Sequence, residues 1–209
     1  MAAIFTASPS RSRSKNVYRI IRQNRDDSIY CFTGQIPEWS DFIEPEKYER
    51  ERMYQMVQLM AASKDDLQTI WKMQIEAFAD LLEKYQDYDT SPGAEKVEKI
   101  EWRYSFPATT YYFIMAGGVK VGVIRVIDHK DEKPKRISPI FIMKEYRNKG
   151  YAQEAILEAE RIHGSTNWCL DTILQEEGNL HLYEKMGYHQ TGKIEKINDR
   201  MDIVFYEKD

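Results

Sequence analysis

A short turn in the second half of this 209-residue chain has the residue types that bind a diphosphate. It reads Arg147-Asn148-Lys149-Gly150-Tyr151-Ala152 and falls between an apolar run and a segment with helical spacing. The N-terminus of a helix exposes unpaired N–H groups and a partial positive charge, so it attracts anions. Gly150 lets a phosphate approach the backbone, and Ala152 keeps the adjoining helix wall low. Arg147 and Lys149 add positive charge where the phosphates would lie.

The turn differs from two common phosphate-binding loops. A P-loop needs Gly-x-x-x-x-Gly-Lys-Ser/Thr, which is absent, and a dinucleotide-binding fingerprint needs more than the single glycine of this turn. Taken alone, Arg-x-x-Gly-x-Ala is a weak signal, because any basic strand-to-helix turn with a glycine has the same residues. The segments on either side therefore decide how the turn is interpreted.

Composition narrows the functional classes. A net charge of -4 gives no overall attraction to nucleic acid or to anionic membranes. The histidines lack metal-ligand spacing, and Cys31 and Cys169 make no disulfide framework, so we expect no metal site and a reduced, cytoplasmic setting. Residues 1–10 lack the features of a signal peptide, and the longest apolar-rich run, Tyr111–Val119, is too short to cross a bilayer. We therefore expect no membrane partner.

The first fifty residues differ from the rest, since they are basic and contain no acidic residue before Asp26. We predict an N-terminal extension over 1–52, basic and flexible, followed by one folded domain over 53–209. A solvated arm is favoured over a nucleic-acid-binding tail, because no aromatic residue is interleaved with the arginines until Tyr18. The tail hypothesis would rest on Arg11, Arg13, Lys15, Arg19, Arg22 and Arg25.

From Val57 onward the periodicity predicts a strand, two helices, three strands, a helix, a strand, a helix and two strands. Ser63 and Asp66 have capping-box spacing at the start of a helix over 64–85. Two β-rich runs, 111–115 and 119–127, flank a Gly-Gly pair and predict a hairpin. The remaining predicted elements are a helix over 95–102, a strand over 137–143, a helix from 152 that Gly164 closes, a strand over 168–173, a helix over 180–186, and strands over 188–194 and 201–206.

In this context Ile140–Ala152 resembles the acetyl-CoA motif of the GCN5-related N-acetyltransferase (GNAT) family, and Leu182–Tyr188 resembles its second signature. The resemblance covers residues 54–207 and implies that the domain over 53–209 is an N-acetyltransferase domain. It implies an α/β fold with a mixed, largely antiparallel central sheet, splayed in the middle and flanked by helices. It also implies an enzyme that transfers the acetyl group of acetyl-CoA directly to a primary amine within a ternary complex. The alternative is a non-catalytic acyl-CoA-binding regulatory module, which would need the turn but no proton donor.

The resemblance implies roles for individual residues. The backbone of one segment would pair with the pantetheine arm: Ile140, Phe141, Ile142 and Met143. A second segment, including its amides, would hold the pyrophosphate: Arg147, Asn148, Lys149, Gly150, Tyr151 and Ala152. An amide of the Phe141–Ile142 stretch would stabilise negative charge on the thioester oxygen. Pro139 fits the splay independently, because proline cannot donate to a strand ladder.

Tyr183 matches the family's usual proton donor. Tyrosine has a pKa of about 10 against about 8.5 for a thiol, so full proton transfer is uphill by roughly 2 kcal/mol without shifts. We therefore interpret Tyr183 as a hydrogen-bond donor to the thiolate. His181 is two residues away, about 200° around a helix, and receives no role. The general base stays open between a water relay and three carboxylates: Asp171, Glu76 and Glu177.

The acceptor amine is not fixed by the sequence. Its site would be built from the first two helices and their loop, with aromatic and acidic residues suited to a cation: Phe78, Leu82, Tyr85, Asp87, Tyr88 and Asp89. A small amine, an amino acid, an antibiotic and a protein terminus remain alternatives, as do a longer acyl donor and a homodimer. Glu176 stands where the family often has asparagine, and we expect Asn179 to cap the following helix.

Overall fold

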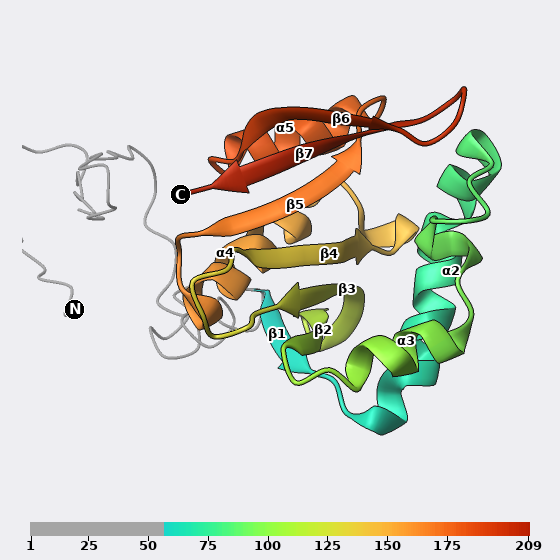
Figure 1. Cartoon of the computed structure of the whole chain (residues 1–209). Coiled ribbons are helices and arrows are strands. Elements are labelled where there is room, and N and C mark those ends of the chain that lie inside the picture. The colour runs from blue at the N-terminus through green and yellow to red at the C-terminus, as the bar shows by residue number, and fades with distance from the viewer. Residues whose placement is uncertain (1–56) are drawn as a thin grey trace, which may run out of the picture. The chain divides into compact units, whose positions relative to one another are not determined.

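The computed structural model describes residues 57–209, which form a set of helices around one sheet (Figure 1). The predicted N-terminal extension, its basic residues and the boundary near Met53 lie outside the described residues. None of the helices in the described range is long and apolar enough to cross a membrane.

The order of elements is the predicted one. Three short 3-10 turns join them: η2 (Lys64–Asp66), η3 (Pro92–Ala94) and η4 (Lys144–Tyr146). The helices are α2 (Leu67–Tyr85), α3 (Val97–Tyr104), α4 (Tyr151–His163) and α5 (Glu177–Lys185). The strands are β1 (Gln58–Ala61), β2 (Thr109–Ala116), β3 (Val119–Ile127), β4 (Lys135–Ile142), β5 (Trp168–Ile173), β6 (His189–Lys196) and β7 (Asp202–Lys208).

The seven strands form one sheet in the order β1-β2-β3-β4-β5-β7-β6. Every neighbouring pair is antiparallel except β4 and β5, which run parallel. Those two strands pair only at Lys135↔Trp168 and Arg136↔Cys169 and then separate. The predicted mixed, largely antiparallel sheet, splayed in the middle, is thus confirmed.

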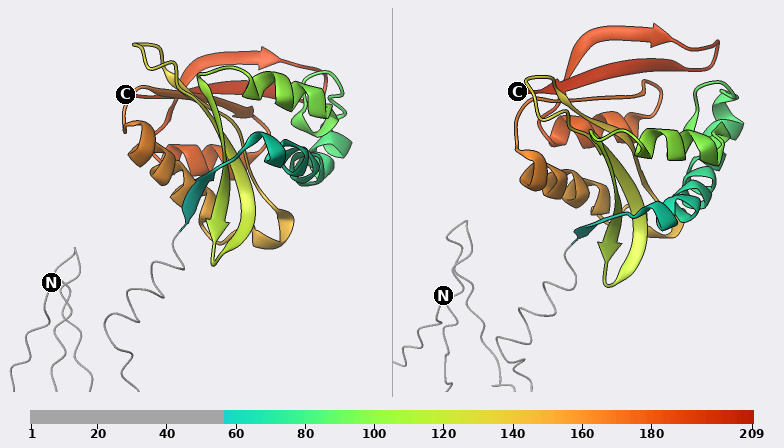
Figure 2. Two further views of the ribbon diagram at one scale, coloured as in Figure 1. Left: turned by 90° about the horizontal axis from the view of Figure 1, so that it is seen from below. Right: turned by 60° about the horizontal axis from the view of Figure 1, so that its bottom comes forward.

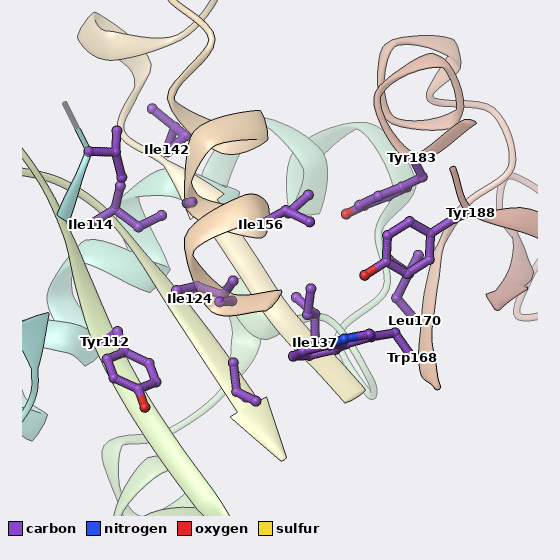
Figure 3. Close-up of a cluster of buried hydrophobic side chains, with 14 of the residues drawn as sticks. Tyr112, Ile114, Ile124, Ile137, Ile142, Ile156, Trp168, Leu170, Tyr183 and Tyr188 are labelled. Atoms are coloured by element: carbon purple, nitrogen blue, oxygen red, sulfur yellow. The ribbon is translucent and has the colours of Figure 1, made fainter. Parts of the chain in front are cut away.

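Strand alternation divides the core into two layers, because successive side chains point to opposite faces of a sheet. One layer lies under α4 and α5 and includes Ile124, Ile156 and Tyr183 (Figure 3). The other lies under α2 and α3 and includes Ile70 and Phe141. Figure 2 shows α2 and α3 on one side of the first three strands and α4 on the other.

The helix ends follow their local chemistry. Ser63 donates both its N–H and its hydroxyl to the Asp66 carboxylate, so the predicted start of the long helix is confirmed, with a 3-10 turn first. The helix predicted over 95–102 begins two residues later, after η3. The prediction that Asn179 caps α5 was wrong, because the helix begins earlier and its N-cap is Glu176. The amide of Asn179 instead donates to the Thr172 hydroxyl (3.2 Å).

Candidate active site

The opening between β4 and β5 begins directly after their last paired residues. Ser138 and Pro139 also have no partner in β3, since the ladder shifts there between Ile140 and Ile137. Pro139 thus lies where a missing N–H costs no ladder bond, as predicted. From residue 137 to residue 142, the backbone groups on the edge of β4 that faces β5 therefore have no partner in β5.

The direction of those groups follows from one hydrogen bond. The N–H of Met143 donates to the carbonyl of Val121 on β3 (2.9 Å). Successive backbone groups alternate sides, so the N–H and C=O of Ile142 and Ile140 face the opening. Of the two residues in the predicted oxyanion-donor stretch, Phe141 and Ile142, it is Ile142 whose N–H lies on the side of the opening.

The turn after β4 exposes amides at the start of α4. Gly150 is the N-cap, with φ 84°, and no side chain caps the helix. Asn148 also has a left-handed φ of 62°. A Cβ on Gly150 would meet no protein atom within 4 Å, so steric crowding does not explain the glycine. The left-handed backbone conformation does, and the missing side chain also leaves the space in front of the turn open. The unpaired N–H groups of the first helical turn thus face an approachable surface.

Arg147 lies in this turn, but its side chain has a different set of partners from the expected one. Its Nε donates to the Ile142 carbonyl (3.0 Å) and a terminal nitrogen donates to the Ala77 carbonyl of α2 (2.7 Å). The guanidinium therefore ties the end of β4 to the middle of α2. The groups of the turn that would remain for an anion are the backbone amides and the Lys149 side chain.

Tyr183 extends from α5 toward the same opening. Its ring is 6% exposed and packs near Tyr188 and Tyr206, with centroids 6.2 and 6.0 Å away. Figure 3 shows its hydroxyl pointing toward Ile156 on α4, and within the described residues this hydroxyl has no hydrogen-bond partner. Burial, with a smaller contribution from the Asp171 carboxylate, raises the pKa of Tyr183 well above its usual value. The phenol is thus a neutral donor without a protein acceptor.

The three candidate bases are in different surroundings. Asp171 lies on β5 beside the opening, half-buried, and is ion-paired with Arg136 of β4. Glu76 and Glu177 are exposed on α2 and at the start of α5. Asp171 is thus the one of the three that a named interaction places at the splay.

Most residues predicted to line the acceptor site are occupied by structural contacts. Phe78 packs edge-to-face on Phe141, with centroids 5.7 Å apart, and Leu82 faces Gly93. Asp87 is buried and accepts hydrogen bonds from Asp89 N–H and from Thr90. The exposed members of the set are Tyr88 and Asp89.

Glu176, the departure from the family pattern, connects two elements of the fold. Its carboxylate accepts from the Tyr85 hydroxyl (2.6 Å) and from Lys84 (2.7 Å), both at the end of α2. Burial raises and these two hydrogen bonds lower the pKa of Glu176, and the lowering is larger. Glu176 thus connects the end of α2 to the start of α5 through these two hydrogen bonds. His181 is exposed while Tyr183 is buried, so the two face different directions, as expected.

Sequence reasoning missed Arg125. It occupies the irregular step of β3, and its Nε donates to the Ser138 carbonyl where β4 leaves β5. Its side chain is 7% exposed. The signal was present, because Arg125 is a lone charge within the apolar strand Val123–Ile127. An isolated arginine in such a run requires a buried hydrogen-bond acceptor.

Two comparisons with known proteins agree with this geometry, and a third, with curated proteins, found none that matches the chain. The sequence profile of the Acetyltransferase (GNAT) family matches residues 71–188, more than half of the chain. Many solved structures share the fold. One is spermidine N-acetyltransferase from Vibrio cholerae in complex with CoA and spermine, with a TM-score of 0.58 at 19% identity over 72% of this chain and 94% of that one.

Two other similar structures act on proteins, according to their names. The acetyltransferase that modifies the N-terminal serine of ribosomal protein L7/L12 in Salmonella typhimurium has a TM-score of 0.57 at 12% identity, over 72% of this chain and 93% of that one. The ribosomal-protein-S18-alanine N-acetyltransferase from Escherichia coli has a TM-score of 0.55 at 11% identity, over 72% and 92%. The chain therefore belongs to the GNAT family and is an acetyl-CoA-dependent N-acyltransferase.

Proposed function

We propose that this enzyme transfers the acetyl group of acetyl-CoA directly to a primary amine, with both substrates bound at the β4–β5 opening. The observation that carries the proposal is the convergence of three features on that opening. These are the free backbone edge of β4, the uncapped N-terminus of α4, and the unpartnered Tyr183 hydroxyl.

The residues divide the work by position. Within the segment Ile140–Met143, the N–H and C=O of Ile140, which face the opening, would hold the pantetheine arm through backbone pairing. The amides of Asn148, Lys149, Gly150, Tyr151 and Ala152, with the Lys149 side chain, would hold the pyrophosphate. Acetyl-CoA supplies the activated acetyl thioester.

Two groups would act on the reacting atoms. The N–H of Ile142 would donate to the carbonyl oxygen as negative charge develops there, which lowers the barrier when the donor is preorganised. Tyr183 would donate a hydrogen bond to the departing sulfur. Asp171 or a water beside it would take a proton from the amine, since it is the candidate carboxylate at the splay.

The direct mechanism can be tested by initial-velocity kinetics with both substrates varied. CoA binding is first shown by calorimetry, and a panel then offers polyamines, amino acids, aminoglycosides and peptides with free N-termini. Double-reciprocal lines that intersect support a ternary complex, and parallel lines contradict it.

Because Cys169 on β5 is a free cysteine near the opening, Cys169→Ser serves as a further check. Retained turnover supports direct transfer, and its loss would indicate an acyl-enzyme.

The alternative, a regulatory module that only binds acyl-CoA, predicts a different result. It would bind CoA with an affinity that Tyr183→Phe leaves unchanged, and it would release no CoA with any amine of the panel. Tyr183 favours the enzyme, because its hydroxyl has no hydrogen-bond partner among the described residues and can therefore donate to a bound substrate.

A further inference from the structure

A groove beside α3 has no role in acetyl transfer as described above. It lies among α3, the loop that leads into β2, and the end of β3, and it encloses about 700 Å³, a size that suits a small molecule. The side chains that give it its character are Lys99, Trp102, Arg103, Phe106, Arg125 and Lys130. We call this the α3 groove.

The α3 groove is basic. Four of those side chains carry a positive charge, and the one carboxylate that lines it, Asp128, is already engaged by Lys130 (2.5 Å) and His163 (2.8 Å). Arg103 is paired with Glu95. Lys99 and Arg125 have no carboxylate partner within the described residues. The groove therefore has an excess of positive charge that protein carboxylates do not neutralise.

Arg125 is the strongest reason to expect a ligand. Its side chain is more than nine-tenths buried, yet within the described residues only its Nε has a partner, the Ser138 carbonyl. The remaining guanidinium N–H groups lack acceptors there. Burial lowers the pKa of Arg125 to about 10. A largely buried cation without a carboxylate partner is costly even where its terminal nitrogens reach solvent, and an anion in the groove would offset that cost.

The groove also presents an aromatic wall. Trp102 and Phe106 are 55% and 43% exposed and meet edge-to-face with centroids 4.7 Å apart. The Lys99 ammonium lies 4.7 Å from the Trp102 ring centroid. Two large aromatic side chains exposed together beside unpaired cations form a surface for a planar ring with an attached anion.

We propose that the α3 groove binds a small aromatic molecule that carries a phosphate or carboxylate group. The anion lies on Arg125 and Lys99, and the ring lies against Trp102 and Phe106. The groove is distinct from the proposed acetyl-CoA site, and Arg125 is the residue that connects the two, since it also contacts Ser138 at the start of the β4–β5 opening.

The test uses the indole N–H signal of Trp102 in ¹⁵N-labelled full-length protein, assigned with Trp102→Phe, in the absence of CoA. Phenyl phosphate and benzoate are titrated, with inorganic phosphate, benzyl alcohol and benzylamine as comparisons. A saturable shift with phenyl phosphate or benzoate, weaker with inorganic phosphate and absent with the uncharged and cationic ligands, is expected. The tighter of the two anions identifies the preferred group. No shift with either anion, or equal shifts with benzylamine, would overturn the proposal.

Substitutions locate the charge. Arg125→Met preserves the apolar bulk of the side chain and is expected to weaken phenyl phosphate binding about tenfold or more. Lys99 is exposed, so Lys99→Met is expected to fold normally. It therefore measures the contribution of a second positive charge independently of Arg125, and we expect several-fold weaker phenyl phosphate binding. Lys185→Met removes an exposed charge on α5 and should leave the affinity unchanged. If Lys99→Met binds as tightly as the unaltered protein and Arg125→Met does too or does not fold, the assignment is wrong.

Discussion

Tyr183 shows how environment decides the role of a side chain. Its burial disfavours the phenolate, so the pKa is raised and the proton is held more firmly than in water. Complete transfer to a thiolate then becomes more unfavourable than the roughly 2 kcal/mol expected without shifts. A hydrogen bond to the departing sulfur needs no such transfer, and the unpartnered hydroxyl can supply it. The structure thus favours stabilisation over full protonation.

Tyr183→Phe should lower kcat roughly 10- to 100-fold with little change in the KM for acetyl-CoA, because a hydrogen bond to a charged group is lost mainly after the substrate has bound. Tyr188→Phe is the matched control. Tyr188 also lies in the buried aromatic cluster, but its hydroxyl donates to Glu160 (3.2 Å) rather than facing the opening. Steady-state kinetics of both variants decide the matter. Equal losses in the two, or no loss in Tyr183→Phe, would remove Tyr183 from the mechanism.

The raised pKa of Tyr183 also predicts the pH dependence of turnover. The group must be protonated to donate, and a raised pKa keeps it protonated beyond pH 10, its usual titration range. At saturating substrates, kcat should rise as the amine and its base lose protons and then stay level up to about pH 10. By the same shift, the contribution of this tyrosine to folding stability is complete below pH 10 and is lost as the pH rises above that value, where the unfolded tyrosine ionises and the buried one does not. An alkaline fall in kcat centred below pH 10 that Tyr183→Phe abolishes would contradict this.

At the scale of elements, the order of helices and strands along the chain could be predicted from the sequence, whereas the geometry of the β4–β5 opening could be predicted only in part. Apolar periodicity and glycine pairs mark helices and hairpins locally, so the order of elements could be predicted along the chain. The partners of Arg147 and Arg125 could not, because they are carbonyls on other elements, at Ala77 and Ser138. Asn179 was mistaken for a cap because cap residues and first-turn residues have similar preferences, and only the packing of α5 decides where it begins.

The turn before α4 makes a testable element. Gly150→Ala adds a methyl group at φ 84°, where an L-residue costs about 1 kcal/mol, without meeting another protein atom. We expect a small loss of thermal stability and a several-fold to tenfold higher Kd for CoA, since the methyl group occupies the approach to the amides. Gly178→Ala, in the first turn of α5 with a Cβ also in open space, is the control and should bind CoA normally. Calorimetry that finds equal CoA affinity in both variants would show that the turn does not hold the pyrophosphate.

At the scale of the whole described structure, α4 joins the two halves of the splayed sheet. Near its end, His163 accepts or donates a hydrogen bond with Tyr112 of β2 (3.0 Å) and contacts Asp128 after β3 (2.8 Å). One turn earlier, both carboxylate oxygens of Glu160 accept hydrogen bonds from the Lys208 ammonium of β7 (2.8 Å each). Because β4 and β5 share so few pairs, such contacts through α4 hold the halves together, alongside the Arg136–Asp171 ion pair and the contacts of Glu176 with α2.

Glu160→Gln tests that linkage. The substitution keeps the size of the side chain but leaves the Lys208 ammonium, which is 21% exposed, beside an uncharged group. Breaking a largely buried pair from one side costs several kcal/mol, and the partial exposure of Lys208 reduces this to about 2 kcal/mol, or a lower Tm by roughly 4–8 °C. Glu158→Gln is the same change two residues away on α4, in an i,i+3 pair with the exposed Arg161, and should cost less than about 0.5 kcal/mol. Thermal melts of both variants measure the difference, and equal shifts would mean that the Glu160 pair does not connect α4 to β7 with the expected strength.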